Sequence, residues 1–106
     1  MSRVVFYNDT KTGVFPASKL VGIKIDGKGL AALYAGQYVR LDLAAGRHHL
    51  DLSHRETLEF HDEYSLRVDE GDLYVRVYCT ELTTRFEASP VQPPGLLEKF
   101  KPLKRQ

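Results

Sequence analysis

The chain has 106 residues, of which 42% are hydrophobic and 27% are charged, and its net charge at pH 7 is +1. This length suits one domain, and the composition excludes a disordered chain and a protein that binds nucleic acid through its overall charge. Cys79 is the only cysteine, so no disulfide can form within the chain. We therefore expect the fold to depend on its hydrophobic core.

Short runs of alternating apolar and polar residues, separated by turn-forming residues, begin the chain. The first run, 3–7, is rich in β-branched and aromatic residues and ends at the polar cluster 8–13. Two further runs, 21–25 and 30–34, flank the turn Asp26-Gly27-Lys28-Gly29. This pattern predicts one strand followed by a β-hairpin.

The stretch from Tyr34 to Leu52 predicts a second hairpin, with its turn at Ala44-Ala45-Gly46. His48 shares the parity of Leu50 and Leu52, so its side chain should point into the core as a neutral imidazole with a depressed pKa. A buried neutral histidine predicts that the free energy of unfolding rises with pH through the range below about 6.5.

The remainder of the chain before its proline-rich end predicts four more strands. Apolar residues first fall on even positions except at Asp62, where we expect a bulge or bend between strands at 57–60 and 64–68. Alternation then predicts strands at 73–80 and 83–88.

These strands, with turns between them and no long helix, predict an all-β fold. We expect a single antiparallel β-sandwich of about seven strands, with a small closed barrel as the alternative. Residues 1–89 are assigned to this domain, and residues 90–106 to a Pro-rich linker and a basic tail packed on it, helical or extended. In the tail, Leu96, Leu97 and Phe100 should dock on a sheet face or an edge strand.

Turn motifs recur in a fixed order: Asp26-Gly27, Gly36-Gln37-Tyr38, Gly46-Arg47-His48 and Gly71-Asp72-Leu73-Tyr74. In this order, over residues 3–80, they resemble an uncharacterised family of small bacterial β-sandwich domains, similar to PEGA domains and often found on envelope lipoproteins. The resemblance implies a β-sandwich. It implies no activity, because the family has no settled biochemical function.

Residue types that bind metals or attack substrates occur without the spacing that such sites need. His49 and Asp51 share a polar strand face, as do Glu59, His61 and Glu63, and we interpret both as solvated faces rather than a metal site. The sequence contains neither a Gly-x-Ser-x-Gly elbow nor a Gly-x-x-x-x-Gly-Lys-Ser/Thr loop. We expect no catalytic residue, no metal, no cofactor and no enzymatic activity, and a metal-dependent hydrolase is the third hypothesis.

One surface pattern predicts binding. If their strands face the same way, alternation places five residues on one outer surface, the Tyr/Arg face: Tyr38, Arg40, Tyr74, Arg76 and Tyr78. Tyrosine and arginine are enriched in the cores of protein interfaces, and tyrosine can also stack on sugars. The alternative is cross-strand pairing that only stabilises the sheet, or cover by the tail.

These observations predict a non-catalytic, bacterial accessory or protein-interaction module. Its partner should be another protein, or envelope material if the chain is exported; the alternative is a domain that binds glycan or another small polar ligand on the Tyr/Arg face. We expect no nucleic-acid partner and no membrane span, because no apolar run is long enough. The chain as given begins without a signal segment, which predicts a cytoplasmic location, or a cell-envelope location if such a segment was removed.

Overall fold

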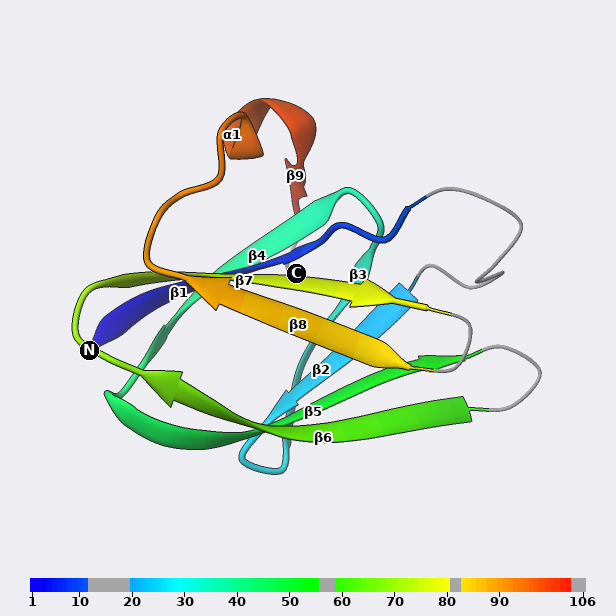
Figure 1. Ribbon diagram of the computed structural model, residues 1–106, viewed down its shortest axis with the longest axis horizontal. Helices are drawn as coiled ribbons and strands as arrows, with labels where there is room; N and C mark the ends of the chain where they lie inside the picture. The colour runs from blue at the N-terminus through cyan, green and yellow to red at the C-terminus, as the bar shows by residue number, and fades with distance from the viewer. Residues whose placement is uncertain (12–19, 56–58, 81–82, 104–106) are drawn as a thin grey trace.

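Two β-sheets packed face to face make up the fold of the chain in the computed structural model (Figure 1). The structure describes residues 1–11, 20–55, 59–80 and 83–103. The elements within these residues are β1 (Ser2–Asn8), β2 (Leu20–Ile25), β3 (Lys28–Tyr34), β4 (Gln37–Leu43), β5 (Gly46–Arg55), β6 (Glu59–Val68), β7 (Asp72–Cys79), β8 (Thr84–Ser89), α1 (Leu96–Lys99) and β9 (Lys101–Pro102). Among them, no helix has the length and apolar character needed to cross a membrane. The predicted all-β sandwich is confirmed.

The strand order corrects the expectation of an antiparallel sandwich of about seven strands. The described residues form nine strands, in a five-stranded sheet of order β8-β7-β1-β4-β9 and a four-stranded sheet of order β3-β2-β5-β6. The four-stranded sheet is antiparallel, but β7 runs parallel to β1, and β9 runs parallel to β4. Alternation of apolar and polar residues is the same in parallel and antiparallel strands, so the sequence pattern does not distinguish the two directions.

The core lies between the sheets and is formed by the inward side chains of seven strands. Alternation along β1 turns Val4 and Phe6 toward the four-stranded sheet, and both are fully buried. The other buried members of this core are Val21, Ile23, Ile25, Leu33, Val39, Leu50, Leu52, Leu66, Val68, Val75, Val77 and Cys79.

The predicted break near Asp62 is wrong, because β6 is one strand that pairs with β5 along its whole length without a bulge. Residues 57 and 58 of the predicted short strand lie outside the described residues. Asp62 takes an inward position in this strand because its Oδ2 accepts a hydrogen bond of 2.7 Å from the main-chain N–H of Thr84 on β8. A partner 22 residues away thus accounts for the polar residue in the apolar pattern.

Thr84 of β8, at the edge of the five-stranded sheet, forms hydrogen bonds with residues of the four-stranded sheet. It is fully buried, and its hydroxyl is joined to His54 Nδ1 by a hydrogen bond of 2.7 Å. Its carbonyl accepts a hydrogen bond of 2.5 Å from the Tyr64 hydroxyl. His54 is itself 2% exposed and stacks on the ring of Phe60 at 5.3 Å. These contacts close one end of the sandwich.

His48 has a charged environment that alternation alone does not reveal. Its side chain is only 12% exposed, but Nδ1 lies 2.6 Å from Asp26 Oδ2 and Nε2 lies 2.7 Å from the Ala44 carbonyl oxygen. Both ring nitrogens face acceptors, so both donate when the ring is protonated. The Ala44 carbonyl and the Asp26 carboxylate therefore raise the pKa of His48, and the predicted neutral histidine with a depressed pKa is wrong.

The free energy of unfolding should fall, not rise, as the pH is raised through the folded pKa of His48. A raised histidine pKa stabilises the fold fully below the unfolded value of about 6.5 and loses this contribution as pH rises through the folded value. The hydrogen bond from His48 lowers the pKa of Asp26, whose contribution is present above about 3.9 and lost as pH falls through its folded value. Urea unfolding between pH 6 and 9 tests this.

Asp26→Asn is the matched variant, because asparagine tolerates the left-handed backbone that Asp26 adopts at φ 52°. Its stability should decline less steeply over the same pH range. Parallel curves for the two proteins, or an NMR titration that gives His48 a pKa at or below about 6.5, would contradict the assignment.

The C-terminal segment, residues 90–103, crosses the outer face of the five-stranded sheet, which is the face turned away from the four-stranded sheet (Figure 1). Leu96 of α1 is 2% exposed and packs on Val5 and Tyr7 of β1. The ring of Phe100 meets that of Tyr7 edge to face at 5.2 Å. Leu97, expected to dock with them, is 63% exposed. After α1 the chain pairs with β4 as β9.

Replacement of Leu96 by alanine should destabilise the protein by about 2–5 kcal/mol, because it removes a buried side chain and leaves a cavity over β1. Leu97→Ala is the control and should change stability by less than about 0.5 kcal/mol, since the side chain is largely exposed. Chemical unfolding measures both. Equal effects of the two substitutions would mean that the C-terminal segment is not docked through Leu96.

Candidate binding cleft

The outer face of the five-stranded sheet carries all five residues of the Tyr/Arg face. Residues opposite each other in a sheet share a face, and Val5 of β1 lies opposite both Arg40 and Tyr74. Two residues further along β1, Tyr7 lies opposite Tyr38 and Arg76, and Tyr78 follows by alternation. The central strand β1 therefore separates the residues of β4 from those of β7.

Arg76 forms ion pairs with acidic side chains and lies over the ring of Tyr78. Arg76 Nε lies 2.7 Å from Asp9 Oδ2, and Nη1 lies 2.5 Å from Glu87 Oε1. The guanidinium carbon lies 4.3 Å from the centre of the Tyr78 ring. Because Arg76 is ion-paired with two carboxylates, this part of the Tyr/Arg face presents no unpaired positive charge.

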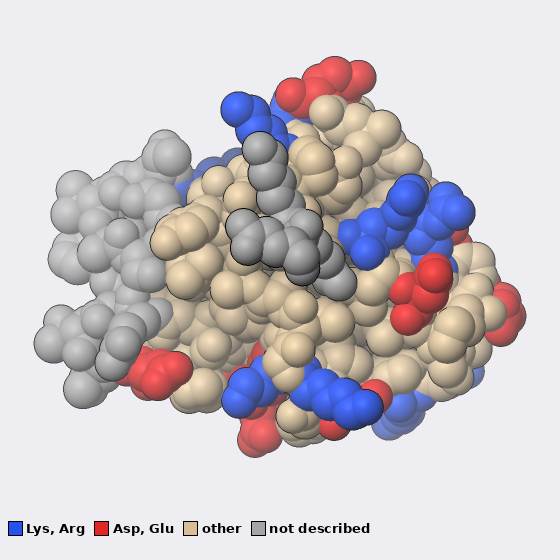
Figure 2. All heavy atoms as spheres, turned by 180° about the vertical axis from the view of Figure 1, so that it is seen from behind, with Lys and Arg blue, Asp and Glu red and all other residues tan. Residues whose placement is uncertain are grey.

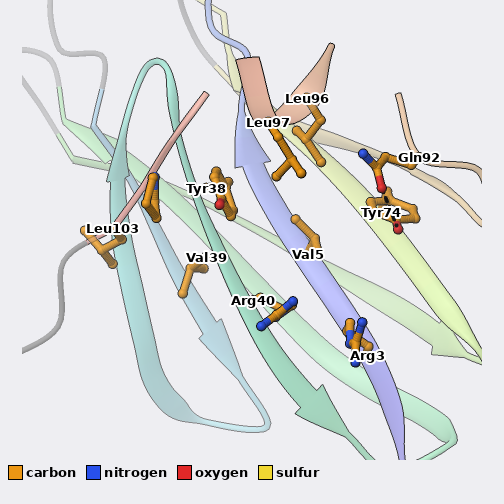
Figure 3. A pocket seen from close by; sticks show the side chains of 11 residues that line it. Arg3, Val5, Tyr38, Val39, Arg40, Tyr74, Gln92, Leu96, Leu97 and Leu103 are labelled. Atoms are coloured by element: carbon orange, nitrogen blue, oxygen red, sulfur yellow. Dashed lines mark hydrogen bonds between the residues drawn. The ribbon is translucent and has the colours of Figure 1, made fainter. Parts of the chain in front are cut away.

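Tyr38, Arg40 and Tyr74 instead line a cleft of about 490 Å³ (Figure 3). Its floor is Val5 of β1, and its wall is the C-terminal segment, which contributes Leu97 from α1. The complete lining is Arg3, Val5, Tyr38, Val39, Arg40, Tyr74, Gln92, Leu96, Leu97, Pro102 and Leu103.

The sequence predictions missed much of this lining. Arg3 and Val5 could have been found, because β1 is apolar at Val5 and Tyr7 on the face opposite its core residues, and a strand that is apolar on both faces is covered on both. Gln92 and Leu103 lie in irregular parts of the C-terminal segment. No alternation pattern marks their positions.

The polar side chains of the cleft differ in whether they have a hydrogen-bond or ion-pair partner. The Tyr74 hydroxyl donates a hydrogen bond of 3.3 Å to Gln92 Oε1 (Figure 3). Arg3 and Arg40 lie at the end of the cleft away from α1 (Figure 3). Within the described part of the chain, neither arginine side chain has an ion-pair or hydrogen-bond partner. The cleft thus presents two unpaired positive charges.

The described lining has no Asp, Glu, His, Cys, Ser or Thr. It suits contact through aromatic, apolar and guanidinium groups. On the other sheet, His49 of β5 pairs with Glu63 at 3.0 Å and His61 of β6 pairs with Asp51 at 3.4 Å, both at the surface. Nowhere in the described ranges do three His, Cys, Asp or Glu side chains come together as a metal site.

Charges elsewhere on the surface are mixed. Figure 2 shows Lys and Arg interspersed with Asp and Glu over the described part of one face, with uncharged residues between them. The described part of that face therefore shows no extended basic surface of the kind that binds nucleic acid through its phosphates.

Comparison with protein-family models, with curated proteins and with solved structures finds no match for the chain. The resemblance to PEGA-like domains stays a prediction. The cleft is the feature from which a function can be argued.

Proposed function

We propose that the chain is a non-catalytic interaction module that binds a segment of a partner protein in the cleft on the outer face of the five-stranded sheet. One observation carries the proposal: the cleft combines two tyrosines, two unpaired arginines and an exposed leucine around an apolar floor. Tyrosine and arginine are enriched among the hot spots of protein interfaces, which cluster in well-packed pockets.

Exposed apolar side chains support the same location. Few large hydrophobic residues in the described part of the chain are exposed, and two of them, Val91 and Leu97, lie in the C-terminal segment that walls the cleft. When a partner covers an apolar side chain that was exposed to water beside a pocket, the burial favours binding. The cleft volume of about 490 Å³ is within the range of about 300–1,000 Å³ that binding pockets occupy.

A glycan or another small polar ligand is the second candidate, because Tyr38 and Tyr74 border the cleft from different strands. A sugar needs hydrogen bonds to its hydroxyl groups as well as rings to stack on. Between the two tyrosines the floor is Val5, and Gln92 is the uncharged amide of the described lining. The apolar floor favours a peptide side chain over a sugar.

Photo-crosslinking in the native cells would test the proposal. A photoreactive phenylalanine analogue at position 97 should trap a defined protein, whereas the same analogue at position 34, an exposed tyrosine on β3 of the other sheet, should not. Affinity for the trapped protein is then measured by calorimetry. Leu97→Asp and Tyr74→Ala should each weaken binding about tenfold or more, equivalent to about 1.4 kcal/mol.

Tyr34→Ala is the matched control and should leave the affinity unchanged, since this exposed ring lies outside the cleft. Equal affinities for the native chain and both cleft variants would contradict the proposal. So would a partner trapped from position 34 and not from position 97.

A further inference from the structure

We propose that the bound partner segment is an extended, acidic peptide: it places a side-chain carboxylate between Arg3 and Arg40 and an apolar side chain beside Leu97. This inference rests on the proposed function and specifies the partner's chemistry. It follows from the arginine pair, from the position of the neighbouring carboxylates and from the side of β4 that pairs with no described residue at Arg40.

The two arginines are placed to share one anionic group. Arg3 lies opposite Asp42 in the register of β1 and β4, and Arg40 is two residues from Asp42, so the arginines are diagonal neighbours on one face. Both line the cleft. No described residue forms an ion pair with either guanidinium group, and a carboxylate placed between them can accept charge-assisted hydrogen bonds from both.

Two aspartates limit the anion to a small one at a defined position. Asp42 and Asp72 flank Arg3 on its neighbouring strands, yet neither forms an ion pair with it and neither lines the cleft. Their negative charge opposes the approach of a polyanion along the sheet. A single carboxylate that enters from the cleft meets the arginines and avoids the aspartates.

The edge of β4 provides the reason for a peptide rather than a free anion. β9 pairs with β4 only at Gln37 and Tyr38. The Leu103 N–H donates a hydrogen bond of 2.8 Å to the Tyr38 carbonyl. Alternation turns the main-chain N–H and C=O of Arg40 to the same side, where no described strand pairs with them. An added strand can take up these groups, a common form of peptide recognition.

The cleft reaches this edge. Val39 of β4 and Leu103, the residue after β9, both line it. A peptide that lies beside Arg40 of β4 can therefore hydrogen-bond with the main-chain groups of this residue and direct alternate side chains into the cleft. Its carboxylate then meets Arg3 and Arg40 at one end, and its apolar side chain meets Leu97 at the other.

Four pools of pentapeptides would test the inference by NMR on the full, isotope-labelled chain. Three pools have both ends blocked and alternate apolar with acidic, apolar with basic, or hydroxyl-bearing with acidic residues; the fourth is all apolar with a free C-terminal carboxylate. The apolar–acidic pool should shift the amide signals of β1 and β4 near Arg3 and Arg40. The other pools should shift them at least about tenfold less at equal concentration.

Charge variants then identify the residues. Arg3→Gln and Arg40→Gln should each weaken binding of the apolar–acidic pool about tenfold, whereas Arg67→Gln, which removes an exposed arginine paired with Asp69 on the other sheet, should not. The double variant Arg3→Glu, Arg40→Glu should prefer the apolar–basic pool. This reversal gives a positive signal that loss of folding cannot produce.

Several results would overturn the inference: equal shifts from the acidic and basic pools, binding of the free-carboxylate pool alone, no shift from any pool, or arginine variants that bind like the native chain. The proposed function fails separately. If Leu97→Asp weakens binding of the crosslinked partner and the arginine variants do not, the cleft binds a partner that is not acidic.

Discussion

The central strand β1 is buried on both faces, and the rest of the structure depends on this constraint. Val4 and Phe6 pack into the sandwich, while Val5 and Tyr7 point out of it and are nonetheless buried. Each fully buried side chain of this size contributes about 1.5–3 kcal/mol, so the outer face of the five-stranded sheet must be covered. The C-terminal segment provides that cover through Leu96 and Phe100.

The cleft exists because the cover is partial. α1 lies over one end of the apolar stripe on β1, and β9 covers only the first two residues of β4. At the other end, Arg3 and Arg40 stay exposed and unpaired by any described residue. One segment thus both completes the hydrophobic packing and forms the wall of the candidate site. Binding in the cleft would extend the layer that the C-terminal segment begins.

Sequence alternation predicted well what depends on local geometry. It placed most of the strands, although it missed β9 and divided β6 at Asp62, and it put Tyr38, Arg40 and Tyr74 on one face. It did not predict the parallel pairing of β1 with β7. These two strands are neighbours in the sheet, but β2 to β6 lie between them in the sequence. It also failed at Asp62, which accepts a hydrogen bond from a distant main-chain group, and at His48, which pairs with Asp26 in the turn between β2 and β3. Such partners are set by tertiary structure, which a local pattern does not encode.

Native-state hydrogen exchange of the full chain tests the central claim most directly. If the C-terminal segment is the cover of β1, the amide of Lys101, which bonds to the Gly36 carbonyl, and that of Leu103, which bonds to the Tyr38 carbonyl, should be protected. Their opening free energies should come within about 1 kcal/mol of those of Val5 and the core of β1. Near-zero protection of both amides beside a fully protected β1 would show that the strand is stable without this cover, and would contradict the account.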